Sequence, residues 1–169
     1  HDAGQIKLVS ITNFSVKKEK VKIFINNAIH PGEPDGVDAS MMLARDLMVK
    51  ENLKKLLDLV EIFIIPVYNT GGALKRGCCS RANQEGPVEY GFRGDALNLD
   101  LNRDFLKCDA LETEVFETYF HKLKPHIFID THVSDGADYQ YTMTLVPSQH
   151  NRLQNGLMED FQQNVLLPS

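Results

Sequence analysis

The chain has 169 residues, 43% of them hydrophobic and 24% charged, which is typical of one globular domain. The formal net charge is −5, with acidic and basic residues mixed along the chain. Nucleic acid is therefore disfavoured as a partner, because phosphate binding requires a basic face. No apolar run approaches the ~20 residues of a membrane span, so we expect no transmembrane helix. The three cysteines form no disulfide framework and are expected to be small, buried or partly buried thiols.

Strands and helices are predicted to alternate from the N-terminal part onwards. Residues Val21–Ile29 are rich in β-branched and aromatic side chains and indicate a strand, and the proline- and glycine-rich loop 30–36 follows it. Hydrophobic residues at helical spacing predict a helix over Val37–Val49, which Leu53–Leu59 continues. Val60–Tyr68 is predicted to be a second buried strand.

The middle of the chain is long and polar. Asn69–Asp95 contains six glycines and no clear period, and loops of this length are commonly functional. Asp109 and Glu112 fit a capping box that opens a helix to about Leu123, before Pro125. Three further elements are predicted: a buried strand over His126–Val133, a strand over Tyr141–Val146 and an amphipathic helix over Gln149–Leu166.

These elements predict an α/β fold in a single domain over residues 1–169. Near-continuous apolar strands between helices indicate a central sheet covered on both faces. In such folds ligands gather at the carboxyl ends of the strands. Both His30 and His132 lie at or just past the end of a predicted strand, which is the first indication of a site.

His30 and Glu33 form the first candidate metal-binding motif. An imidazole and a carboxylate three residues apart in a turn can point at one cation, and two histidines with one glutamate are a known ligand set for catalytic zinc. His132 directly follows an apolar run and supplies the second imidazole. Asp130, two residues earlier, either orients a ligand or faces a helix terminus.

A third motif runs from Leu99 to Phe105. Arg103 offers a rigid fork for a carboxylate and Asn102 adds amide donors, which suits the free C-terminus of a peptide. Asp100 can accept the distal N–H of a zinc-bound histidine. The same residues also fit an ordinary solvated turn.

Taken in order, His30-Pro31-Gly32-Glu33, Asp100-Leu101-Asn102-Arg103 and Asp130-Thr131-His132 resemble the zinc metallocarboxypeptidases of carboxypeptidase A type, peptidase family M14. The resemblance covers about Val21 to Val146. It implies a mixed, largely parallel central sheet with helices on both faces. It also implies Zn²⁺ held by His30, Glu33 and His132. Asn69-Thr70-Gly71-Gly72 departs in two positions from the family's N-P-D-G.

The resemblance also implies an activity, the removal of a C-terminal residue from peptides by metal-activated water. Asn102 and Arg103 would bind the free C-terminal carboxylate of the substrate. Arg81 is the best match to the arginine that polarises the scissile carbonyl, with Arg76 and Arg93 as alternatives. Secretion or a periplasmic location would follow only from the habits of the family.

The general-base glutamate and the substrate-covering tyrosine of the family have no identifiable counterpart after His132. The acids that remain there are Asp135, Asp138, Glu159 and Asp160. We therefore expect a catalytic domain truncated at its C-terminus, which binds zinc weakly and hydrolyses peptides poorly or not at all. Two alternatives stay open: a zinc deacylase of the aspartoacylase and succinylglutamate desuccinylase type, and a non-catalytic module that binds peptide C-termini.

Overall fold

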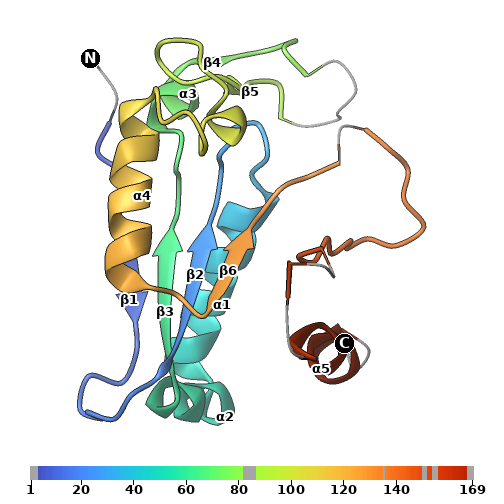
Figure 1. Cartoon of the computed structure of the whole chain (residues 1–169). Helices are drawn as coiled ribbons and strands as arrows, with labels where there is room; N and C mark the ends of the chain where they lie inside the picture. Colours follow the sequence, from blue (N-terminus) through green and yellow to red (C-terminus); the bar gives the residue numbers. More distant parts are fainter. Residues whose placement is uncertain (1–3, 82–86, 135, 150–151, 154–155, 167–169) are drawn as a thin grey trace. The chain divides into compact units, whose positions relative to one another are not determined.

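The computed structural model describes residues 4–81, 87–134, 136–149, 152–153 and 156–166. They belong to two compact units, His1–Gly136 and Ala137–Ser169, and each is described by itself (Figure 1). The first unit contains the sheet, the helices that cover it and the candidate metal centre.

A four-stranded sheet in the order β1-β3-β2-β6 forms the centre of the first unit. β2 (Val21–Asn26) pairs in parallel with β3 (Val60–Ile65) on one side and with β6 (Ile127–Asp130) on the other. β1 (Val9–Ile11) pairs antiparallel with β3 and was not predicted. The sheet is mixed and largely parallel, as the family resemblance implied.

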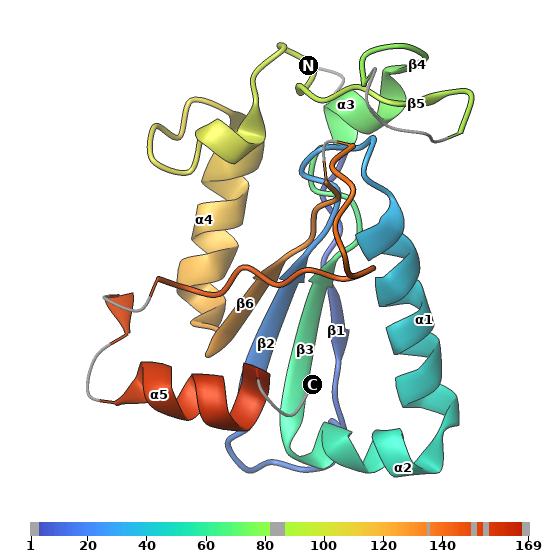
Figure 2. The same ribbon diagram turned by 90° about the vertical axis from the view of Figure 1, so that its right-hand side faces the viewer.

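Helices cover both faces of this sheet, which confirms the predicted layers. Figures 1 and 2 show α4 (Leu111–Leu123) on one face and α1 (Asp35–Val49), followed by α2 (Glu51–Lys54), on the other. Strand residues alternate between the two cores. The core beneath α4 contains Phe24, Ile29, Phe63, Ile65, Tyr68, Leu101, Ala110 and Phe116, and the core beneath α1 contains Ile11, Ile25, Leu47, Leu57, Ile62 and Ile64.

The parallel register brings three strand ends to one edge of the sheet. Asn26, the last residue of β2, is opposite Ile65 of β3 and Asp130 of β6. The segments that follow these residues therefore begin side by side, and they carry His30 and His132. This is the edge at which the sequence predicted a site.

The segment Asn69–Asp95 contains short regular elements rather than one irregular loop. It comprises α3 (Thr70–Leu74) and a hairpin of β4 (Arg76–Gly77) and β5 (Tyr90–Gly91). The side-chain oxygen of Asn69 accepts the N–H of Gly72 at 2.7 Å, and its amide donates to the carbonyls of Ile29 and Arg93 at 3.3 and 3.1 Å. Asn69 thereby joins the start of α3 to the loops on either side of the site.

Gly71 explains one departure from the family motif. A Cβ at this position would lie 2.6 Å from the backbone nitrogen of Ala96, so the close approach of the two backbones leaves no room for the family's aspartate.

Three sequence-based expectations about this unit were wrong. Cys78 and Cys79 form a disulfide, and they and the free Cys108 are exposed, because the short hairpin and turn that carry them cover no core. No side chain of a capping box caps α4: the carboxylate of Asp104 instead accepts the N–H groups of Asp109 and Ala110 at 3.0 and 2.9 Å.

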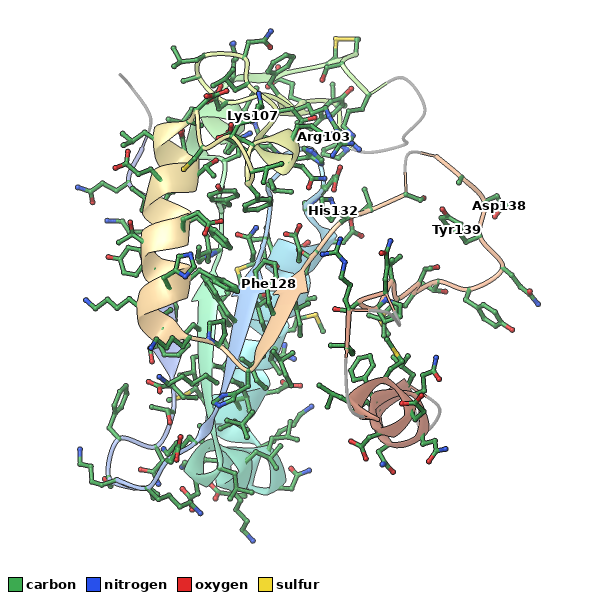
Figure 3. The ribbon with its side chains drawn as sticks, viewed as in Figure 1. Arg103, Lys107, Phe128, His132, Asp138 and Tyr139 are labelled. Atoms are coloured by element: carbon green, nitrogen blue, oxygen red, sulfur yellow. A yellow bond between two sulfur atoms is a disulfide. The ribbon has the colours of Figure 1, made fainter. Side chains whose placement is uncertain are left out.

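The third concerns β6, which was predicted to be a buried strand. Ile127, Phe128 and Ile129 are 45%, 39% and 41% exposed. Among the residues that the structure describes, β6 pairs with β2 alone, so it lies at the edge of the four-stranded sheet. Phe128, labelled in Figure 3, still contacts Phe24 and Phe116 with ring centroids 5.8 and 5.7 Å apart.

The second unit, Ala137–Ser169, contains less regular structure than predicted. Tyr141–Val146 is not a strand, since the described residues of this unit contain no strand with which it could pair. The helix predicted over Gln149–Leu166 is observed as α5 (Leu157–Phe161) continued by a π-helical turn (Gln162–Leu166). Gly156, at φ 74°, precedes its first residue. Within the described residues, no helix has the length and apolar character needed to cross a bilayer.

Candidate metal centre

The loop after β2 brings His30 and Glu33 together. The N–H of Glu33 donates to the carbonyl of His30 at 3.0 Å and closes a turn. The same turn places Nδ1 of His30 2.9 Å from Oε1 of Glu33, and each side chain is 3% exposed. Two buried polar side chains at the end of a hydrophobic strand are stable only when they are paired, and here they pair with each other.

His132 reaches the same carboxylate from the segment after β6. Its Nδ1 lies 3.0 Å from Oε2 of Glu33, and the N–H of Val133 donates to that oxygen at 3.2 Å. One ligand atom from each of His30, Glu33 and His132 lies within 4.8 Å of the others. The three predicted metal ligands therefore converge, although His132 follows Glu33 by 99 residues.

Both histidines are held at the far ring nitrogen by an aspartate. Nε2 of His30 is 3.2 Å from Oδ1 of Asp100, and Nε2 of His132 is 2.9 Å from Oδ2 of Asp130. A carboxylate at Nε2 holds a proton on that nitrogen, so Nδ1, which faces Glu33, is the nitrogen that would give up its proton and bind a metal. Two imidazole nitrogens and one carboxylate are a donor set that fits catalytic zinc.

The electrostatics of the cluster favour a negative Glu33 beside positive charge. Burial opposes ionisation of Glu33, but hydrogen bonds from His132 and His30 and the charge of Arg81 outweigh it and hold its pKa far below the usual value. Hydrogen bonds to Asp130 and Glu33, which outweigh desolvation, raise the pKa of His132 to about 10. The position between these side chains thus favours a cation.

Of the three candidate arginines, Arg81 is the one placed on the cluster. Its Nη2 lies 2.8 Å from Oε1 of Glu33, and its side chain is 6% exposed. Gly32 makes room for it, because a Cβ there would lie 2.7 Å from Cδ of Arg81. Arg76 instead donates to the carbonyl of Glu89. Arg93 belongs to the support of the site rather than to its centre.

The predicted carboxylate clamp lies in a 3-10 turn over Leu101–Arg103. Asp100 caps this turn by accepting the N–H of Asn102 at 3.0 Å while it also contacts His30. Arg103 is exposed, and its Nη1 donates to the carbonyl of Asn102 at 2.9 Å. Figure 3 shows Arg103 at the same end of the sheet as His132.

Two further residues support the site and were not predicted to do so. Nε of Arg93 donates to Oδ2 of Asp100 at 3.0 Å, and Nδ2 of Asn26 donates to Oδ1 of Asp130 at 2.9 Å. From the sequence, Arg93 was only an alternative to Arg81 as the arginine that polarises the scissile carbonyl. Asn26 lies in a strand predicted from its apolar residues, where the neighbouring amides of Asn26 and Asn27 were the only signal.

None of the acids considered as a general base is a described residue of the first unit. Asp138, Glu159 and Asp160 belong to the second unit, and Asp135 lies outside the described residues.

Comparison with known proteins shows the family of this chain. The zinc carboxypeptidase family model, Peptidase M14, matches residues 4–126, which is more than half of the chain. The chain therefore belongs to the zinc carboxypeptidase family. It is also 31% identical over 114 residues to carboxypeptidase 2 of Trichophyton rubrum, a match that covers 67% of this chain and 18% of that protein.

Solved structures share the fold. A metallo-carboxypeptidase from Burkholderia cenocepacia matches with a TM-score of 0.61 and 22% identity, over 78% of this chain and 34% of that one. A putative carboxypeptidase A from Shewanella denitrificans matches with a TM-score of 0.63 and 23% identity, over 79% and 33%. The chain thus spans about a third of the length of these solved structures and under a fifth of the curated relative.

Proposed function

We propose that this chain is part of a zinc metallocarboxypeptidase that removes the C-terminal residue from peptides, and that residues 1–169 form part of one catalytic domain. The observation that carries the proposal is the convergence of two Nδ1 atoms on the carboxylate of Glu33, with both Nε2 atoms held by aspartates. A zinc ion bound there would lower the pKa of a water molecule and polarise the scissile carbonyl.

The roles of the protein side chains follow from their positions. His30, Glu33 and His132 would bind the metal. Arg81, almost fully buried beside Glu33, would donate to the oxygen of the scissile carbonyl as negative charge develops on it.

Substrate binding is assigned to the turn that carries Asp100. Asn102 and Arg103 would bind the terminal carboxylate of the substrate, since Arg103 is exposed at the same end of the sheet. A peptide whose C-terminus is amidated lacks this carboxylate and should bind poorly.

We further propose that this chain alone hydrolyses peptides poorly. Each carboxylate of the cluster already contacts a histidine: Glu33 faces both Nδ1 atoms, and Asp100 and Asp130 face the Nε2 atoms. A general base must be able to take a proton from water. Robust peptidase activity of the chain by itself would contradict this part of the proposal.

Zinc content and zinc affinity test the metal site directly. We expect about one zinc ion per purified chain and its loss in both His30→Ala and His132→Ala. His121→Ala is the matched control, because His121 lies on α4 with a side chain that is 79% exposed. Zinc binding that both variants leave unchanged would contradict the assignment.

Substrate class is tested separately in a longer protein that includes this chain and is active. Release of the last residue from free peptides, but not from C-terminally amidated ones, is the expected result. Cleavage of N-acyl amino acids without cleavage of peptides would identify a deacylase instead.

A further inference from the structure

Each of the two histidines of the centre is supported by two hydrogen bonds in series. On one side Arg93 donates to Asp100, which contacts His30. On the other side the donor is a neutral amide, Nδ2 of Asn26, which lies 2.9 Å from Oδ1 of Asp130. Oδ2 of the same aspartate lies 2.9 Å from Nε2 of His132.

Asn26 lies in the sheet where it can hold Asp130, and through Asp130 the ring of His132. It is the last residue of β2, it is opposite Asp130 in the parallel register, and it is fully buried. Its carbonyl also accepts the N–H of Thr131 at 3.0 Å and the hydroxyl of Thr131 at 3.2 Å. Asn26 therefore contacts both residues that precede His132.

The side chain of Asn26 is an unfavourable choice for a purely structural position. Its Oδ1 is the one buried side-chain polar atom among the described residues that has no hydrogen-bond partner. The preceding residues of β2, Phe24 and Ile25, are buried and apolar, so the site could hold an apolar side chain without leaving a polar atom unpaired. The benefit of the amide must come from its donor.

That donor has a definite orientation. Exchange of Oδ1 and Nδ2 would place a carbonyl oxygen against the carboxylate of Asp130, where two acceptors repel each other. Asn26 therefore presents its N–H₂ group to Asp130.

We propose that Asn26 is a positioning residue for the metal centre, which acts through Asp130 to orient His132. By holding Oδ1 of Asp130, Asn26 directs Oδ2 towards Nε2 of His132. This fixes the proton on Nε2 and presents Nδ1 to the metal. The inference rests on the proposed metal site.

His132 needs this support because burial does not confine it. Its side chain is 34% exposed and that of Asp130 is 21% exposed, whereas that of His30 is 3% exposed. Without a fixed partner, the carboxylate of Asp130 could turn towards solvent and leave the ring of His132 free to rotate. Asn26 is the fully buried residue of these three, so it can hold Asp130 and His132 in place.

The test is the zinc affinity of Asn26→Leu, measured by competition with a chromophoric chelator. Leu keeps the branched shape and the number of side-chain heavy atoms of Asn, and it removes the donor. We expect zinc binding to weaken by about 10- to 100-fold, as for other residues that support metal ligands. We also expect a changed visible absorption spectrum when Co²⁺ replaces zinc, because the orientation of His132 changes.

A double-mutant cycle separates positioning from a general effect on folding. In the Asp130→Ala background, Asn26→Leu should weaken zinc binding by less than about twofold more, since its route to His132 is already removed. Ser40→Ala is the matched control: Ser40 is a buried polar neighbour that hydrogen-bonds to Asn27, and its removal should leave zinc binding unchanged.

Three results would overturn the inference. These are zinc affinity of Asn26→Leu within twofold of wild type, losses that add fully in the double variant, and an unchanged Co²⁺ spectrum. If Asn26→Leu does not fold, Asn26→Thr carries the same expectations, because its hydroxyl is too short to reach Asp130. Zinc binding indifferent to His30→Ala and His132→Ala would instead overturn the metal site itself, and the inference with it.

Discussion

The two sides of the metal centre each hold one histidine, but they differ in which residues of the support are buried. On the His30 side, the histidine is buried and its supporting pair is partly exposed: the side chains of Arg93 and Asp100 are 36% and 29% exposed. On the His132 side, the histidine is partly exposed on the segment after an edge strand, and its last support, Asn26, is fully buried.

The difference shows where each side obtains its rigidity. The ring of His30 is confined by its surroundings, so a partly exposed ion pair suffices to keep a proton on its Nε2. The ring of His132 has no such confinement, so a buried hydrogen bond supplies it. Removing the outer support should therefore cost more on the His132 side, and the variants below test that difference.

Glu33→Ala should have the largest effect, because this carboxylate is where the two sides meet. Its two oxygens face the two Nδ1 atoms at 2.9 and 3.0 Å. We expect zinc affinity to fall by more than about 100-fold, beyond the range for supporting residues. Glu51→Ala, on an exposed position of α2, serves as the control in the same titration. A loss below tenfold would mean that the histidines hold the ion without Glu33.

Arg93→Gln is the counterpart of Asn26→Leu and should be milder. We expect zinc affinity to fall by at most about tenfold, the lower end for supporting residues, because the pair with Asp100 is partly exposed and His30 is confined by burial. The effect should shrink further between 0.1 and 1 M salt, since salt screens exposed charges. Titrations at both salt concentrations decide this. A larger loss for Arg93→Gln than for Asn26→Leu would reverse the comparison.

The sequence predicted the features of the two sides that depend on a local pattern of residues. The apolar runs of β2, β3 and β6 were recognisable, and their ends placed His30 and His132 at one edge of the sheet. β1 was missed although the residues around it are largely apolar, because a strand of three residues gains its stability from β3, about 50 residues away. Tyr141–Val146 had the composition of a strand, but composition does not supply a pairing partner.

The support of the histidines was harder to predict for the same reason. The sequence left two roles open for Asp130, to orient a ligand or to face a helix terminus. The choice depends on the orientation of its side chain, which in the structure points to His132. Asn26 acts across 104 residues of sequence, through a register that exists only once β2 and β6 pair. The motif around Asp100 indicated one support from the sequence, whereas the support from Asn26 depends on strand pairing that exists only in the folded sheet.

Asp104→Asn tests how firmly the His30 support is anchored, since Asp104 follows the turn that carries Asp100. Burial opposes its ionisation, but hydrogen bonds from Thr113 and from the N–H groups of Ala110 and Asp109 outweigh it and lower its pKa below the ordinary 3.8. A lowered pKa contributes stability that is present above pH 3.8 and is lost as the pH falls through the folded-state pKa.

We therefore expect Asp104→Asn to lower the free energy of unfolding by about 1 kcal/mol at pH 7, as for the loss of a helix cap. The difference from wild type should shrink at pH 3. Denaturant unfolding at both pH values measures it. Asp109→Asn is the control, since the side chain of Asp109 is exposed and pairs with the exposed Lys107, and it should change stability by less than about 0.5 kcal/mol. A pH-independent difference would show that the charge of Asp104 is not what anchors the turn.

Arg81→Ala should have the smallest effect on zinc, and in the opposite direction. Its guanidinium lies 2.8 Å from Oε1 of Glu33, so a positive charge occupies the neighbourhood in which a zinc ion would bind. Two positive charges this close repel each other, and removing one should strengthen zinc binding by about two- to threefold. Arg76→Ala, on the exposed hairpin, should leave the affinity unchanged. If Arg81→Ala instead weakens zinc binding, then Arg81 holds Glu33 in place for the metal, and the centre has a third support that neither histidine provides.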